Sequence, residues 1–213
     1  MNTSPQRFSL EWVVLGICLT AMVAVEWVWW PHWGLGLGAE TAPLAWLQCQ
    51  ALTACALCAA MRSALPRLAL ASGTATTGSR AINGWAVLAL LIFLASLDER
   101  FMFHEQIQEQ LTFTLIDRFH MPDELALRRV QALTGVYALA GLVGLWWLLA
   151  QATAPAWRWM RTGIVIGMVA IGMDVATDDM QWQILEEALE FLAETCMLCG
   201  LLNEVRTRVT PPN

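Results

Sequence analysis

The chain has 213 residues, of which 57% are hydrophobic and 14% are charged, and its mean hydropathy is +0.52. This composition lies outside the range of water-soluble globular domains and predicts a membrane protein. All twelve basic residues are arginine and the net charge is −6, so no basic patch is available for a phosphate backbone. The composition therefore excludes nucleic acid as a partner.

Six apolar segments reach the length of about 20 residues that a helix needs to cross the hydrocarbon core. They predict an all-α fold, a six-helix transmembrane bundle that forms a single integral membrane domain over residues 1–213. The expected spans are approximately residues 9–30, 43–62, 82–105, 128–150, 159–180 and 184–205.

The segment between the third and fourth spans, residues 106–127, mixes Leu, Ile and Phe with charged residues. This pattern predicts a short helix that lies in the outer membrane interface. Asp123 and Glu124 directly follow Pro122 and suit the first turn of the next helix, where the helix dipole favours negative charge.

Arginine is enriched in cytoplasmic loops, so its distribution predicts the orientation of the spans. With the N-terminus inside, eight of the twelve arginines lie on the cytoplasmic side and four lie outside. We therefore expect a multi-pass protein of the bacterial inner (plasma) membrane with both termini cytoplasmic. Only Glu11 and Glu204 among the acidic residues then lie inside, and the other sixteen lie at or toward the outer side.

The last expected span carries a stripe of polar residues. Successive residues of an α-helix are about 100° apart around its axis, and at this spacing the polar side chains of the stripe all lie within an arc of about 100°. They are Gln183, Glu186, Glu187, Glu190 and Glu194. Carboxylates at membrane depth are costly, which favours a functional interpretation of the stripe.

The fifth span has a small-residue face formed by Gly163, Gly167 and Ala170, which lets another helix approach closely. The same face leads outward to Asp174 and Asp178 and should direct them into the bundle. On the third span, Asp98 shares a face with Glu105, whereas Glu99 and His104 point away from that face.

Glu26 in the first span and His32 just beyond it could close the same site from another side. Carboxylates gathered in this way must share protons, pair with arginine or surround a cation. Four outer arginines cannot neutralise the set, which favours a bound divalent metal cation. The expected ligands are Asp98, Glu105, Asp174, Asp178, Glu187, Glu190 and Glu194.

Oxygen ligands indicate Ca²⁺, Mg²⁺ or Mn²⁺ at such a site, and recruitment of His104 would admit Zn²⁺ or Fe²⁺. The simpler alternative is that several of these acids cap solvated helix ends. No nucleophile elbow, zinc-protease motif or phosphate-binding loop is present in the sequence.

Three functions remain open. In a metal-dependent enzyme, His104 or Glu105 would move protons for a metal-bound water that attacks a lipid or lipid-linked substrate. In a cation or proton transporter or binding protein, the glutamate stripe would accept the ion. A non-catalytic subunit of a membrane complex, with a membrane-protein partner, is the third possibility.

Two Cys-x-x-Cys pairs, Cys55 with Cys58 and Cys196 with Cys199, lie at similar depths on their expected spans. Four thiolates would suit Zn²⁺ or an iron–sulfur cluster, and two dithiols would suit a redox relay. Buried cysteines that act as small apolar residues are the alternative.

The run Leu-Asp-Glu-Arg-Phe-Met-Phe-His-Glu at residues 97–105 is followed by a Glu-rich run at residues 185–192. This pair of segments resembles uncharacterised bacterial multi-pass membrane proteins that carry an Asp-[Asp/Glu]-x-Phe-x-x-His-Glu segment and a later Glu-rich helix. The resemblance implies that the two segments act as a unit, and it implies no substrate.

Overall fold

The computed structural model describes residues 10–29, 43–71, 84–150, 152–176 and 180–209. Every regular element in these ranges is a helix, which confirms the all-α prediction. The helices are α1 (Leu10–Trp29), α3 (Pro43–Ala71), α4 (Gly84–Phe101), α5 (Phe103–Phe119), α6 (Asp123–Leu149), α7 (Ala154–Ala176) and α8 (Met180–Val209).

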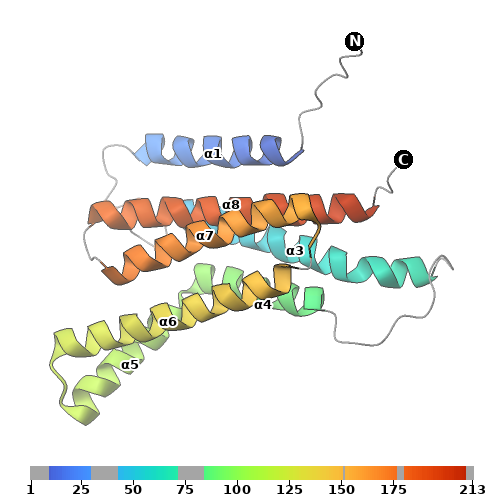
Figure 1. Ribbon diagram of the computed structural model, residues 1–213. Coiled ribbons are helices and arrows are strands. Elements are labelled where there is room, and N and C mark those ends of the chain that lie inside the picture. Colours follow the sequence, from blue (N-terminus) through green and yellow to red (C-terminus); the bar gives the residue numbers. More distant parts are fainter. Residues whose placement is uncertain (1–9, 30–42, 72–83, 151, 177–179, 210–213) are drawn as a thin grey trace.

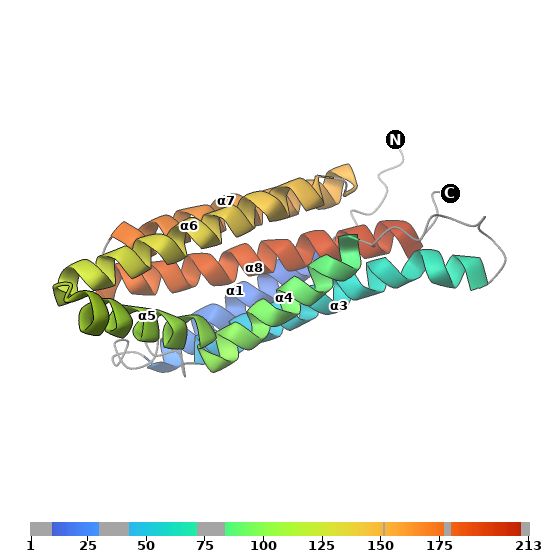
Figure 2. The same cartoon turned by 90° about the horizontal axis from the view of Figure 1, so that it is seen from below.

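Helix α8 packs against α7, α3 and α1, and α3 also packs against α4 (Figure 1). Figure 2 shows α6 and α7 on one side of α8 and α3 and α4 on the other. The main core lies between these helices and includes Leu88, Met160, Ile164, Met197 and Leu201, all of which are buried. This arrangement leaves one face of α8 directed toward α3 and α4.

Glycines let α7 and α8 approach each other closely. A Cβ atom added at Gly163 would lie 2.6 Å from the backbone oxygen of Ala193, and one at Gly200 would lie 2.5 Å from Cγ of Met160. A larger residue at either position would push the two helices apart. The prediction that the small-residue face of residues 163–170 packs against another helix is therefore confirmed.

The prediction of a six-span transmembrane bundle is wrong. Among the described residues, two helices are long and apolar enough to cross a membrane, Pro43–Leu65 and Asp123–Leu149. The apolar part of α1, Leu10–Val25, is too short. Helix α8 carries five glutamates and two arginines that interrupt its apolar runs, and α4 ends in three consecutive charged residues.

The predicted boundary between the third span and the interfacial helix is also wrong. The helix breaks at Met102, whose φ of 54° is left-handed, and α5 begins at Phe103. Helix α5 packs against α6. Helix α6 begins at Asp123 with Asp123 and Glu124 in its first turn, as the position of Pro122 predicts.

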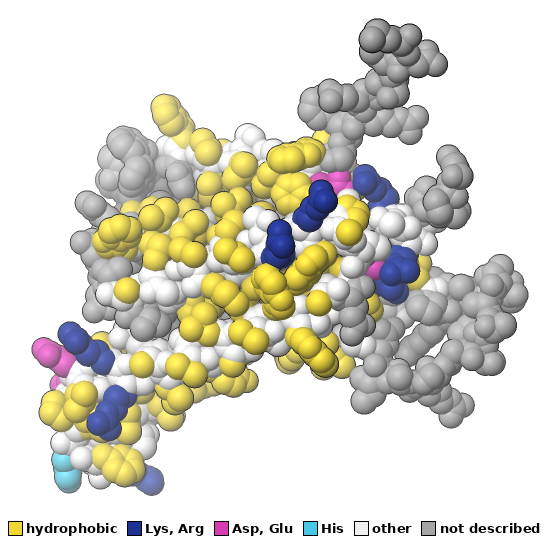
Figure 3. All heavy atoms as spheres, viewed as in Figure 1, with side chains coloured by type: hydrophobic (Ala, Val, Ile, Leu, Met, Phe, Trp, Pro, Cys, Tyr) yellow, Lys and Arg dark blue, Asp and Glu magenta, His cyan; other side chains and the backbone are white. Residues whose placement is uncertain are grey.

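Large hydrophobic side chains cover much of the surface. Leu133, Val136, Tyr137 and Trp147 on α6 are each at least 62% exposed. Figure 3 shows hydrophobic side chains spread over the face on which α7 and α8 lie. Exposed apolar area on this scale indicates contact with lipid or with another protein.

Candidate functional site

Carboxylates from α4 and α8 lie near enough to act on one another electrostatically. Glu187, Glu190 and Glu194 come from α8 and Glu99 comes from the end of α4. Burial raises the pKa of Glu194 well above its usual value of 4.5, and charge repulsion from Glu99, Glu190 and Glu187 raises it further. We call Glu99, Glu187, Glu190 and Glu194 the acidic centre.

Glu194 is the deepest member of the acidic centre. Its Oε2 atom is buried and has no hydrogen-bond partner within the described part of the chain. An ionised carboxylate in such a position loses its hydration without compensation, whereas a protonated one does not carry that cost. The environment of Glu194 therefore favours the protonated acid.

Helix α3 contributes Gln48, whose side chain is fully buried. Its Nε2 atom donates a hydrogen bond of 3.2 Å to Oε2 of Glu187, and its Oε1 atom has no partner among the described residues. Gln48 thus leaves a second buried acceptor beside the acidic centre. Two unsatisfied acceptor oxygens in one region call for a donor proton or a cation.

Hydroxyl groups fix α3 against α4 one helical turn before Glu99. The Oγ atom of Ser96 lies 2.7 Å from Oγ1 of Thr53 and donates a hydrogen bond of 3.0 Å to the backbone oxygen of Cys49. Ser96 is almost fully buried. These contacts hold the end of α4 against α3, on the element that carries Glu99.

The structure places two predicted site residues elsewhere. Asp98 accepts hydrogen bonds from His104 through both carboxylate oxygens, at 2.8 Å from the backbone N–H and 2.9 Å from Nδ1. The pair is substantially exposed, with side-chain exposures of 35% and 46%. Asp98 therefore holds the start of α5 and is not among the carboxylates that act on Glu194.

The remaining predicted ligands cannot be placed by their side chains. Glu105 lies on α5 and Asp174 on α7, but their side chains are outside the described residues, as are Asp178, Glu26 and His32. Within the described part, no group of three or more His, Cys, Asp or Glu side chains is arranged to hold a metal ion. The metal ligand set stays a prediction.

The sequence pattern missed Glu99 because the acids of the third span were assigned to a face through Asp98. A better signal was available in the apolar spacing. The buried residues of α4 are Leu88, Ile92 and Ser96, and Glu99 follows three residues later on the same side of the helix.

The two Cys-x-x-Cys pairs are buried on α3 and α8. Burial raises the pKa of Cys196 to about 11 and that of Cys199 to about 12. The Sγ atom of Cys199 donates to the backbone oxygen of Glu11 at 3.3 Å. A thiol with a raised pKa is a weaker nucleophile at neutral pH, because the thiolate is the reactive form. Their environment supports a structural role.

A second polar cluster lies at the opposite end of α8 and was not predicted as a site. Glu204 is fully buried and accepts from Arg62 at 3.0 Å, from Arg208 at 3.1 Å and from the backbone N–H of Thr153 at 2.8 Å. Glu204 thereby joins α3 and the start of α7 to α8.

Glu11, which is also almost fully buried, anchors α1 at the same end. Its Oε1 atom accepts from Asn203 at 2.5 Å and pairs with Arg206 at 3.0 Å. These contacts join the start of α1 to the last turns of α8. Both buried carboxylates at this end are therefore satisfied, in contrast to Glu194.

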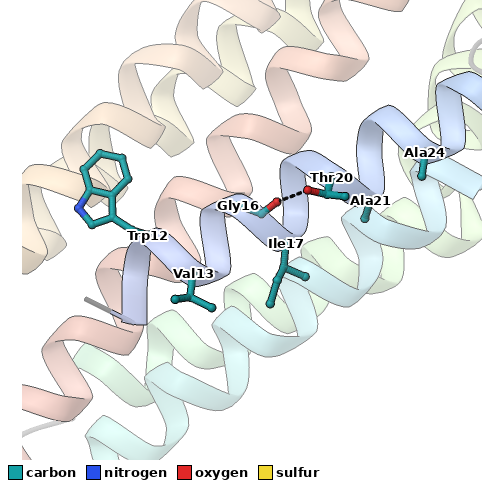
Figure 4. Close-up of a pocket in the computed structure, with 7 residues that line it drawn as sticks. All are labelled: Trp12, Val13, Gly16, Ile17, Thr20, Ala21 and Ala24. Carbon is teal, nitrogen blue, oxygen red and sulfur yellow. Dashed lines mark hydrogen bonds between the residues drawn. The ribbon is translucent and has the colours of Figure 1, made fainter. Parts of the chain in front are cut away.

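A shallow depression runs along the outward face of α1 (Figure 4). It is lined by residues of α1 alone, including Gly16 and Thr20, whose hydroxyl donates to the backbone oxygen of Gly16 at 2.7 Å. The lining has no charged side chain, so the depression offers no catalytic chemistry.

A family profile with the description "Domain of unknown function (DUF8692)" matches residues 31–205. The chain belongs to the DUF8692 family. The DUF8692 match includes every residue of the acidic centre, together with Gln48 and Glu204. No curated protein and no solved structure matches the chain.

Proposed function

We propose that this DUF8692 protein is an integral membrane protein that binds protons at the acidic centre. The membrane location is supported by the two helices that could span a bilayer and by the exposed apolar side chains of α6. The observation that carries the proton-binding proposal is the buried Oε2 atom of Glu194, for which the described part of the chain offers no hydrogen-bond partner.

The electrostatics of the acidic centre favour uptake of a proton. The described residues contain no metal-ligand group of three or more members, yet Glu99, Glu190 and Glu187 act electrostatically on Glu194. Mutual repulsion without direct coordination raises proton affinity without forming a coordination shell. The repulsion within the acidic centre therefore supports proton binding at Glu194.

The interior between Glu194 and Glu204 argues for proton binding rather than conduction. Most buried side chains of α8 in this stretch are apolar or thiol-bearing, including Met197, Leu198 and Leu201, and the two polar ones, Thr195 and Asn203, lie next to its ends. A conduction path would need a chain of polar groups or water through this layer. We therefore propose that protons reach the acidic centre from the end of the bundle at which α8 begins.

Infrared spectroscopy of the purified, detergent-solubilised chain tests the proposal through the carboxylic acid C=O band. A band from a protonated acid should persist at pH values above 4.5, the usual pKa of glutamate. The substitution Glu194→Gln should remove this band, and Glu109→Gln on the exposed surface of α5 should leave it unchanged. Absence of the band from the parent protein would refute proton binding at Glu194.

Proteoliposomes separate binding from transport. With the chain reconstituted, an imposed pH gradient should decay no faster than in empty liposomes. Faster decay that Glu194→Gln abolishes would show conduction instead. Elemental analysis of the same samples completes the comparison, because stoichiometric divalent metal that depends on Glu194 would favour the metal site over the proton.

A further inference from the structure

Five arginines of the described chain gather at the end of the bundle where α8 terminates. They are Arg62 on α3, Arg158 and Arg161 on α7, and Arg206 and Arg208 on α8. The carboxylates at this end are Glu11 and Glu204. We call the five arginines the arginine end. Five arginines against two glutamates leave the arginine end with an excess of positive charge.

Three of these arginines are used within the fold. Arg62 and Arg208 pair with Glu204, and Arg206 pairs with Glu11. Arg158 and Arg161 are exposed, and no ion pair to either is found among the described residues. These two arginines are therefore available to a partner.

The helix dipole of α7 does not account for the positions of Arg158 and Arg161. Both lie in the first turns of α7, near the end of the helix where the dipole is positive and cations are not stabilised. They are separated by three residues and therefore lie on one face of the helix. A face with two uncompensated positive charges suits an anion outside the chain.

Tryptophans gather at the same end. Trp12 packs edge-on against Trp159 with ring centroids 5.1 Å apart, and Trp146 packs in the same way against Trp157 at 4.9 Å. The guanidinium of Arg62 lies 5.3 Å from the ring of Trp85. Tryptophan and arginine concentrate at the boundary between membrane hydrocarbon and water. This combination places the arginine end at the level of lipid headgroups.

On the face of α7 that carries Arg158 and Arg161, the charged side chains are followed along the helix by apolar ones. Val165 and Val169 follow Arg161 along the same side of the helix and are 48% and 52% exposed. A phospholipid has the same sequence of parts, with an anionic phosphate above an acyl chain. A free phosphate ion would contact only the arginines and would leave the valines exposed to water.

We propose that the arginine end binds anionic phospholipids, with Arg158 and Arg161 holding the headgroup phosphate and Val165 and Val169 contacting the acyl chain. This inference rests on the membrane location proposed above and is independent of proton binding at Glu194. Guanidinium groups suit phosphate because their paired N–H donors match its oxygens.

Native mass spectrometry of the full chain released from detergent micelles tests the inference. Phosphatidylglycerol and phosphatidylcholine of matched acyl chains are titrated separately, and the dissociation constant of the tightest site is measured. The parent chain should retain phosphatidylglycerol more tightly. Because each arginine near an anionic surface contributes about 1 kcal/mol, R158Q/R161Q should weaken phosphatidylglycerol binding by up to about 30-fold. Phosphatidylcholine binding should be unchanged.

The matched control is R128Q/R129Q, which removes two exposed arginines near the start of α6 and should leave the lipid preference intact. Equal retention of both lipids by the parent chain would overturn the proposal, as would equal losses in the two double variants. Displacement of phosphatidylglycerol by an equimolar amount of inorganic phosphate would indicate a free-anion site instead. The infrared band of Glu194 should be unaffected by R158Q/R161Q, so the two proposals fail separately.

Discussion

The two ion pairs of Glu204 provide a direct test of which contacts stabilise the bundle. Both Arg62 and Arg208 bond to the same atom, Oε1, at nearly equal distances of 3.0 and 3.1 Å. Their surroundings differ, because the Arg62 side chain is 15% exposed and joins two helices, whereas Arg208 is 45% exposed and lies one turn from Glu204 on α8.

Removing one partner of a buried ion pair typically costs about 3 to 5 kcal/mol, because the other charge stays buried without compensation. Arg208 would remain beside Glu204 in R62Q, so we expect a loss near the lower end, about 3 kcal/mol in the free energy of unfolding. An exposed pair one helical turn apart contributes only about 0.3 to 0.5 kcal/mol. The R208Q variant should therefore lose about 0.5 kcal/mol.

Equilibrium unfolding in mixed micelles, followed by far-ultraviolet circular dichroism, gives these free energies. Double-mutant cycles with E204Q isolate each pairwise contribution. Added salt should weaken the Arg208 coupling more than the Arg62 coupling, because exposed charges are screened more strongly. The reasoning is refuted if the coupling of Arg62 to Glu204 is no larger than that of Arg208.

The pH dependence of this cluster follows from the pKa of Glu204. Burial raises that pKa, but hydrogen bonds from the Thr153 backbone, Arg62 and Arg208 outweigh burial and lower it below 4.5. A depressed carboxyl pKa stabilises the fold above the unfolded-state pKa, and this stabilisation is lost as pH falls through the lowered pKa. The difference in the free energy of unfolding between the parent chain and E204Q should therefore become smaller as the pH falls through the lowered pKa of Glu204.

Two further predictions concern helix contacts. Gly200→Ala should lower the free energy of unfolding by about 1 to 3 kcal/mol, because the added Cβ would meet Met160. Gly141→Ala should raise the free energy of unfolding by up to about 1 kcal/mol, because the added Cβ has open space and alanine favours the helix. Chemical denaturation measures both values, and equal effects of the two substitutions would contradict the packing argument. Glu11→Gln should raise hydrogen exchange in α1 by about 10-fold through loss of a charged hydrogen bond, without changing exchange in α6; unchanged protection of α1 would show that Glu11 does not anchor it.

Local signals in the sequence predicted parts of the fold well. The spacing of Gly163 and Gly167 predicted a helix contact that α8 makes, and Pro122 with its following acids predicted the start of α6. These features depend on steric size and on the helix dipole, which act over one or two turns. The number of spans was predicted wrongly, because the mean hydropathy of a segment does not show where charged residues interrupt its apolar runs.

The site was predicted in part for a similar reason. The stripe from Glu187 to Glu194 follows from helical periodicity, and the structure keeps those side chains on the face that meets Glu99. The left-handed residue Met102 could not be foreseen, because methionine has no preference for that conformation. That break brings His104 back to Asp98, and Asp98 is thereby used within its own segment.

The carboxylates of Glu204 and Glu194, which both lie on α8, differ in their hydrogen bonding. Glu204 and Gly200 fasten the final turns of α8 to α3 and α7, whereas the Oε2 atom of Glu194 has no hydrogen-bond partner among the residues that the structure describes. Loss of the proton from Glu194 would leave a charge that no described side chain is placed to solvate, and water would be drawn toward it. Hydration of the bundle interior should therefore begin at Glu194 and not at Glu204, whose carboxylate is already paired with Arg62 and Arg208.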